Sequence, residues 1–484
     1  MLPQFHLARA RNETRITCSN IESSCRSFKR VAKPGNLDLE GLHPYSMPSE
    51  TDMMPDNVQK TARRGASLLR LLVRNQWLMA DQALVSGMNF LTTATLARML
   101  GVHNFGVFSV FYILLQYLNT VPMAITISPM MSLGPQINDQ AKHRTFLRGM
   151  AGYQYVLSLG LCLATLICVL ALKIHLGPWQ VQPGLLLPYL LTIFCFQAQD
   201  WFRRFCYVQG NGRAVFWNDV ISYMGQVAIL GFLWWLHRMS VNAAYYAIAL
   251  TSMIAFVAGY LSADIGSSWK ETRTAVTATW ATGRTLLMTS QLQWLGTQGI
   301  FLIVAYVAGV SAASGIRAAL TLMGPVIMLY QLLDNVIPVR SAAAFAAGGE
   351  RGLIAYLRRT LIIIAAFIGP LIVFACFFAG PIMSKVFGRA YSGFSVLVVW
   401  AGLYQGTLLI IKWLSYYFRT LNKTQIMART AMVVSVLSVG ACMLLTRRFG
   451  AVGGLAAVVA GQVITISIFT VHAQRMHREA LLAG

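Results

Sequence analysis

Residues 81–98 read DQALVSGMNFLTTATLAR, an apolar helical pattern that carries one polar stripe. The stripe consists of Gln82, Ser86, Asn89 and Thr93, which follow one another at intervals of four, three and four residues and therefore line one face of an α-helix. Polar side chains find no partners in hydrocarbon. Such a helix suits a membrane span whose polar face meets protein or water.

The composition of the whole chain agrees with lipid as its solvent. Of 484 residues, 56% are hydrophobic and 11% are charged, and the mean hydropathy is +0.58. A soluble core cannot bury so much apolar surface. Each of twelve apolar stretches is near the roughly 20 residues that a bilayer core requires. We predict spans at 78–100, 105–127, 150–172, 185–202, 218–235, 243–263, 285–308, 316–338, 361–379, 394–416, 428–445 and 453–471.

Basic residues alternate between the connections, which indicates the orientation. One set of connections holds 23 Lys and Arg residues, and the other holds only seven: Arg98, Lys173, Arg238, Lys385, Arg389, Arg447 and Arg448. Short Lys/Arg-rich loops stay on the cytoplasmic side of a membrane. We therefore expect both termini in the cytoplasm. The net charge of +23 then contacts anionic lipids rather than nucleic acid, because the basic residues form no run with interleaved aromatics.

Three regions are expected along the chain. Residues 1–62 are polar and proline-containing and predict a disordered cytoplasmic tail. Residues 63–283 form an amino-terminal lobe, which begins with an interfacial helix at 63–77 and contains the first six spans. Residues 284–484 form a carboxy-terminal lobe, and a loop at 264–283 joins the two lobes. The fold class is an all-α integral membrane protein.

The two lobes resemble each other in sequence. Gly101-Val102 after the first span corresponds to Gly309-Val310 after the seventh, and Pro129 corresponds to Pro338 at a similar offset. Glycine and proline recur at helix ends for backbone reasons of their own. Together the matches favour two six-helix lobes related by a pseudo-repeat, an architecture common among transporters.

A second polar stripe, Ser290, Gln293 and Thr297, lies in the seventh span at depths matching the first. Two interpretations stay open. The stripes line a shared central cavity, or they supply interhelical hydrogen bonds in a static bundle. Repetition in both halves favours the cavity.

Ionisable residues inside spans are rare and usually line a pathway. Arg317 and Lys412 are the candidate cations, and the alternative is that their long stems carry the charges to the two membrane interfaces. Asp81 suits a helix amino terminus, where a negative charge is favourable. Asp334 lies near a helix carboxy terminus and needs a partner, which Arg340 or the other lobe supplies. We consider Asp81 and Asp334 coupling or gating candidates.

Other classes of site are not encoded. The eight cysteines are scattered, with no CxxC pair and no histidine at ligand spacing, so we predict no metal and no cofactor. A nucleotide-binding P-loop is missing. The connections on the less basic side are short, which disfavours an enzyme such as a membrane polymerase or ligase. A cationic, hydrogen-bonding interior with few deep carboxylates indicates an anionic substrate with hydroxyl groups.

The sequence is similar to the polysaccharide transport family of lipid-linked oligosaccharide flippases, within the multidrug/oligosaccharidyl-lipid/polysaccharide exporter superfamily. The resemblance covers about residues 76–474 and rests on four groups of residues: Asp81 to Gly87 with Asn89-Phe90; Leu96-Ala97-Arg98 with Phe105-Gly106; Ile127 to Met131 with Gly134-Pro135; and Leu333-Asp334-Asn335 with Pro338.

This resemblance implies a carrier that moves an undecaprenyl-diphosphate-linked repeat unit across the bacterial inner membrane by alternating access, for exopolysaccharide synthesis of a xanthan-like type. A polymerase and export machinery are the implied partners. Arg98, Arg317 or Lys412 would meet the diphosphate, while Asn89, Gln293 and Thr297 would bind sugar hydroxyls. The main alternative is a cation-coupled drug exporter of the same superfamily.

The predicted topology is testable with reporter fusions. Alkaline phosphatase fused at Gly210 or Gly348 should stay inactive, because both positions belong to connections rich in basic residues. A fusion at Arg238 should be active and serves as the control. Phosphatase activity from the Gly210 or Gly348 fusion would overturn the orientation.

Overall fold

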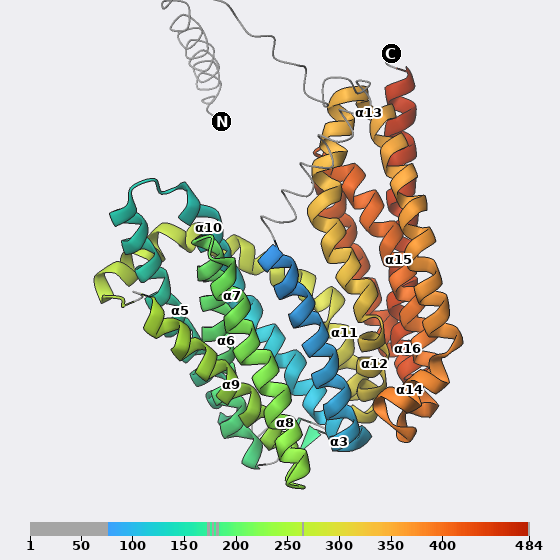
Figure 1. The fold of residues 1–484 in the computed structure, drawn as a ribbon. Helices are drawn as coiled ribbons and strands as arrows, with labels where there is room; N and C mark the ends of the chain where they lie inside the picture. Colours follow the sequence, from blue (N-terminus) through green and yellow to red (C-terminus); the bar gives the residue numbers. More distant parts are fainter. Residues whose placement is uncertain (1–75, 172–174, 177–178, 181–182, 264–265, 483–484) are drawn as a thin grey trace, which may run out of the picture. The chain divides into compact units, whose positions relative to one another are not determined.

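The computed structural model describes residues 76–171, 175–176, 179–180, 183–263 and 266–482, all of which belong to one compact unit, Leu71–Gly484. The predicted tail, and the predicted interfacial helix up to residue 75, lie outside the described residues. Within them the chain is almost entirely helical (Figure 1).

The first half of the chain begins with one long helix and continues through several shorter ones. In order they are α3 (Gln76–Pro122), the π-helix η3 (Met123–Ile127), α4 (Ser128–Leu133), the 3-10 turn η4 (Gly134–Gln136), α5 (Gln140–Ala171), η5 (Pro183–Leu185), α6 (Leu186–Val208), α7 (Gly212–Asp219), the π-helix η6 (Val220–Met224), α8 (Gly225–Trp235) and α9 (Val241–Ser262). Between α5 and η5, the two-residue strands β1 (His175–Leu176) and β2 (Trp179–Gln180) pair antiparallel, with His175 opposite Gln180.

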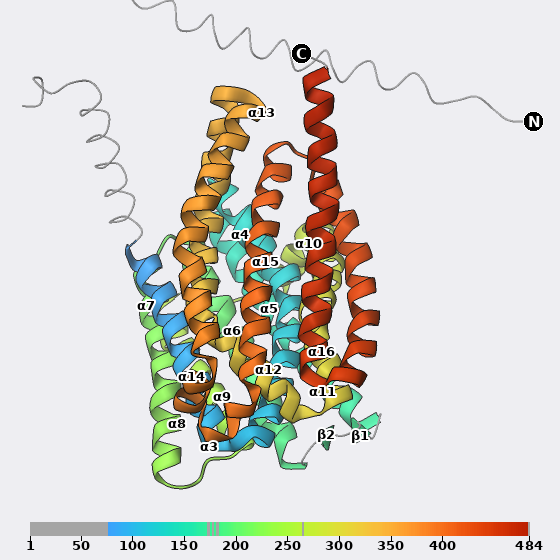
Figure 2. The ribbon, with the colours of Figure 1, turned by 90° about the vertical axis from the view of Figure 1, so that its right-hand side faces the viewer.

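The second half contains the longest helices. They are α10 (Trp269–Thr297), α11 (Gly299–Ala308), α12 (Val310–Leu322), α13 (Gly324–Phe377), α14 (Ala379–Phe387), the 3-10 turn η7 (Arg389–Phe394), α15 (Ser395–Thr420) and α16 (Thr424–Leu482). Helices α13, α15 and α16 pack beside one another (Figure 2).

The predicted spans fall on helical residues, and six of the described helices are long and apolar enough to cross a membrane. The count of twelve spans in two lobes stays a prediction. One expectation is wrong: the connection predicted as a loop at 264–283 is helical from Trp269 onward. Ser268 caps α10, because its hydroxyl accepts from the Glu271 amide while the Glu271 carboxylate accepts from the Ser268 amide.

Glycines in the left-handed region interrupt the long helices. Gly101 breaks α3 with φ 71° and ψ 173°, and Gly309 separates α11 from α12 with φ 88° and ψ 163°. Residues other than glycine are strained at these positive φ angles. Gly101 and Gly309 occupy equivalent positions in the predicted repeat, and their similar backbone angles agree with that equivalence.

The two halves of the chain share a hydrophobic core in which α3 packs against α12. Phe105 of α3 meets the ring of Tyr391 at a centroid distance of 6.4 Å, and the Tyr391 hydroxyl lies 3.0 Å from that of Ser314. At Gly106 a Cβ atom would overlap the Val310 carbonyl oxygen. Small residues permit such close helix approach in membrane proteins.

Gly106→Ala should therefore destabilise the purified protein by about 1 to 3 kcal/mol, since an added methyl group must push α3 and α12 apart. Gly87→Ala, in the same helix but with open space around it, is the matched control and should be neutral or slightly stabilising. Thermal unfolding in detergent measures both. Equal melting temperatures for the two variants would contradict the close packing.

Candidate functional site

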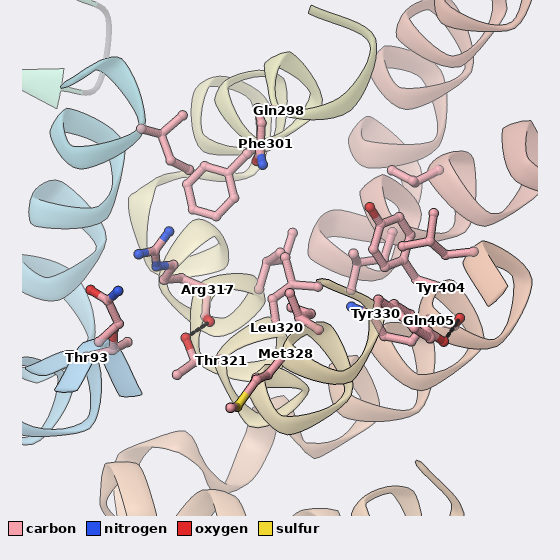
Figure 3. A pocket seen from close by; sticks show the side chains of 18 of the residues that line it. Thr93, Gln298, Phe301, Arg317, Leu320, Thr321, Met328, Tyr330, Tyr404 and Gln405 are labelled. Atoms are coloured by element: carbon pink, nitrogen blue, oxygen red, sulfur yellow. Dashed lines mark hydrogen bonds between the residues drawn. The ribbon is translucent and has the colours of Figure 1, made fainter. Parts of the chain in front are cut away.

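A cavity of about 540 Å³ lies between helices of both halves of the chain. Its walls come from α3, α11, α12, α13, α15 and α16. Figure 3 shows Arg317 projecting from α12, with Thr93 of α3 on one side and Tyr330, Tyr404 and Gln405 on the other. The breaks around Gln298 and Met323 divide the second-half helices here, so that short helices form part of the wall.

Arg317 is the cation of the cavity wall that has no carboxylate partner among the residues the structure describes. Its guanidinium carbon lies 4.9 Å from the centre of the Tyr112 ring, a cation–π contact that orients the group. The side chain is half-buried and borders the cavity. This position agrees with the cavity interpretation of Arg317, and its role in substrate binding stays a prediction. A planar guanidinium in this position offers several N–H donors to an anion.

Lys412 and Asp334 form an ion pair in the same wall. The Lys412 Nζ atom lies 2.6 Å from an Asp334 carboxylate oxygen and 5.8 Å from the Tyr330 ring centre. Tyr416 donates its hydroxyl to the other Asp334 oxygen. Asp334 was expected to pair with Arg340 or the other lobe, but its partner is Lys412 on α15. The cavity thus holds a carboxylate, and it is less purely cationic than the sequence indicated.

Three of the four members of the polar stripe of the first span face the cavity, which agrees with the cavity interpretation. Ser86, Asn89 and Thr93 line it, and the Gln82 amide donates to the Gln331 side chain at 2.6 Å. On the opposite wall, the Gln405 side-chain oxygen is buried and has no hydrogen-bond partner among the described residues. The cavity is also lined by four polar residues that were not predicted: Gln298, Thr321, Gln331 and Gln405. Their signal was weak, because single amides and hydroxyls are scattered through other spans without a repeat.

A small recess of about 20 Å³ adjoins the cavity at Arg317. Its lining includes hydroxyl and amide side chains from the first half of the chain, and Arg317 is the lining residue from the second half. Its polar members are Asn89, Thr92, Thr93, Tyr112, Ser222, Tyr223, Gln226 and Ser252. The Thr92 hydroxyl is buried and has no hydrogen-bond partner in the part of the chain that the structure describes.

The remaining predicted site residues lie elsewhere. Arg98 is exposed, borders none of the described cavities and donates to the carbonyl oxygen of Lys385. The Ser290 hydroxyl donates to the Leu287 carbonyl of its own helix. The side chains of Gln293 and Thr297 lie outside the described part of the structure, so their proposed role stays a prediction.

A buried ionic network holds α3, α6 and α7 together. Arg203 of α6 donates to Asp81 at 2.8 Å, and its Nε atom lies 2.6 Å from an Asp219 carboxylate oxygen. Tyr207 also donates to Asp81, at 2.7 Å. Asp81 is fully buried, so its explanation as a helix-terminal charge is wrong. Likewise Arg203 belongs to a buried helix face rather than to a loop.

The described residues show no candidate metal site. The described residues contain no group of three or more His, Cys, Asp or Glu side chains arranged to hold a metal ion.

The network and the cavity predict different responses to loss of an arginine. Arg203→Met would leave Asp81 and Asp219 buried together without their cation, which should cost about 3 kcal/mol or more of stability. Arg317→Met removes a charge that pairs with no carboxylate in the described structure and should change stability little. Thermal unfolding of the two purified variants tests the contrast. Equal losses would contradict the structural role of the Arg203 network.

No protein-family model matches the chain, and no curated protein matches it significantly. An inward-facing multidrug resistance MATE family transporter of the MOP superfamily matches with a TM-score of 0.62 and 14% identity, over 82% of this chain and 95% of that one. The lipid II flippase MurJ in an inward closed conformation matches with a TM-score of 0.63 and 13% identity, over 83% and 87%.

A crystal structure of MATE in complex with MaL6 gives a TM-score of 0.58 at 13% identity, over 85% of this chain and 97% of that one. These similarities agree with the superfamily that the sequence motifs resemble. The chain is a multi-pass membrane protein with the fold of the MOP-superfamily transporters.

Proposed function

We propose that this protein is a flippase that moves a polyprenyl-diphosphate-linked oligosaccharide across the bacterial inner membrane. The observation that carries the proposal is Arg317, a guanidinium that borders a cavity between the two halves of the chain and has no described carboxylate partner. Ionisable residues inside membrane spans are costly and usually line a substrate or ion pathway, and a cation in such a pathway suits an anionic substrate.

The diphosphate is the anion that fits this cavity chemistry. Of the charged lining residues, Arg317 and Lys412 are positive and Asp334 is negative, so the wall carries net positive charge. A guanidinium binds two phosphate oxygens at once, which favours Arg317 as the main contact. Lys412 supplies a second positive charge to the lining of the same cavity, where Asp334 competes for it.

The glycan has polar and aromatic surfaces to contact. Asn89, Thr93, Gln298 and Gln405 offer amide and hydroxyl groups around the same space. Sugar hydroxyls both donate and accept hydrogen bonds, which suits amide side chains. Gln293 and Thr297 are proposed for the same role, and Arg98 for a contact with the diphosphate outside this cavity.

Transport by alternating access would expose the cavity first to the cytoplasmic and then to the outer leaflet, with both termini in the cytoplasm. Asp334 is proposed to act in coupling or gating, because its ion pair with Lys412 is accessible from the cavity. Asp81 was the other candidate for this role, but its buried pair with Arg203 favours a structural role. The prenyl tail stays in the bilayer beside exposed apolar helix faces. Anionic lipids meet the basic helix ends, and a polymerase and export machinery of a xanthan-like exopolysaccharide pathway would receive the product.

The alternative function is a cation-coupled exporter of small molecules. Asp334 in the cavity wall favours it, because a carboxylate suits a positively charged drug. The MATE-like fold is compatible with it. Efflux of a cationic dye from liposomes that contain the purified protein would support this alternative over the flippase.

The proposed function predicts a strong dependence on Arg317. In liposomes with a fluorescent polyprenyl-diphosphate oligosaccharide, Arg317→Ala should slow movement between leaflets by about tenfold or more, since a charge-assisted hydrogen bond contributes about 1.5 to 3 kcal/mol. Arg317→Lys should recover part of the rate, because an ammonium acts as a point charge.

Arg238→Ala is the matched control, because Arg238 is an exposed arginine that borders none of the described cavities. It should transport like the wild type. A normal rate for Arg317→Ala at wild-type protein content would contradict the assigned role.

A further inference from the structure

The Lys412–Asp334 ion pair is accessible to a ligand, unlike the two ion pairs that Arg203 forms. The side chains of Lys412 and Asp334 are 22% and 41% exposed, whereas Arg203 and its two carboxylate partners are 10% exposed or less. Both members of the accessible pair also line the main cavity. An anion in that cavity therefore meets a lysine that already has a carboxylate bound to it.

The two members of the pair are held unequally. Asp334 is anchored by the Tyr416 hydroxyl in addition to Lys412. Lys412 contacts Asp334 and the face of the Tyr330 ring, which binds a cation only weakly. A lysine also has a flexible four-carbon stem and three donors that rotate. When a second anion approaches, Lys412 is thus the member that changes partner while Asp334 stays in place.

We propose that Asp334 is a built-in competitor of the substrate diphosphate for Lys412. In the empty cavity the carboxylate binds the ammonium group. A diphosphate docked on Arg317 then draws Lys412 to its second phosphate, and Asp334 later takes Lys412 back and so promotes release. This inference rests on the proposed function and explains how the same site binds the diphosphate and then releases it.

The exchange makes the cavity selective for multiply charged anions. A ligand with a single phosphate group, which carries about 1.5 to 2 negative charges at pH 7, binds Arg317 but has no second phosphate to replace the carboxylate at Lys412. A diphosphate carries at least one further negative charge, so that it satisfies both cations at once. The pair therefore raises the preference for a diphosphate over a monophosphate only while Asp334 is ionised and present.

The test measures binding of two probes, farnesyl diphosphate and farnesyl monophosphate, to the purified full-length protein in detergent. Asp334→Asn removes the competing charge with little change of shape. We expect it to tighten binding of farnesyl diphosphate by about tenfold and that of the monophosphate by a larger factor, so that the preference for the diphosphate falls; equal factors for the two probes would contradict the selectivity. It should also slow the flipping of the labelled lipid-linked oligosaccharide, because release loses its competitor.

Lys412→Met and the double variant Lys412→Met/Asp334→Asn complete a cycle that isolates the coupling of the two residues. Without Lys412, loss of Asp334 should change diphosphate affinity by at most about twofold. Asp334→Ser is the second variant if Asp334→Asn does not fold, and it should tighten binding in the same way.

The outcomes separate this inference from the proposed function. If the wild type binds farnesyl diphosphate but Asp334→Asn binds it equally or more weakly, the competitor role is wrong and the flippase proposal stands. If Asp334→Asn binds more tightly by the same factor with and without Lys412, general charge repulsion replaces the exchange. If the wild type binds no prenyl diphosphate, the proposed function itself fails.

Discussion

A charge that leaves water for a membrane interior must find a partner, and this constraint organises the described structure. Arg203 satisfies it with two buried carboxylates, and the result is a rigid network joining three helices. Lys412 satisfies it with one accessible carboxylate. Arg317 contacts the Tyr112 ring and borders the cavity, with no carboxylate partner among the described residues. The three cations thus define a structural site, an exchangeable pair and an anion-binding candidate.

The backbone places Arg317 where both halves of the chain meet. Helix α12 begins after Gly309, whose left-handed conformation turns the chain, and packs against α3 at the side-chain-free surface of Gly106. One turn of α12 further on, Ser314 binds Tyr391. Arg317 follows on the same helix and reaches Tyr112 of α3. Movement of one half against the other would therefore change the surroundings of the guanidinium directly.

Hydropathy and helical spacing predicted much of this arrangement, because both depend on neighbours in sequence. The helical stretches were predictable. For Asn89, Thr93 and Arg317 the pattern favoured a cavity over its alternatives, and all three line one, although their roles stay predictions. The Lys412–Asp334 pair was not predictable, because it joins α13 and α15 across 78 residues and neither position reveals the rotation of its helix. The Asp81–Arg203 contact spans 122 residues. The start of α10 was missed because hydropathy does not mark polar helices, although Ser268 and Glu271 carry a capping signal.

The central claim is that the cavity beside Arg317 receives the diphosphate of a lipid-linked sugar. The most direct measurement is a cryo-electron microscopy structure of the protein in lipid nanodiscs with a polyprenyl-diphosphate oligosaccharide added. The account predicts density for the two phosphates between Arg317 and Lys412, with the first sugar against the polar wall that contains Asn89. An empty cavity with the lipid bound at another surface, or a cationic drug occupying the cavity at Asp334 in preference to this lipid, would contradict it.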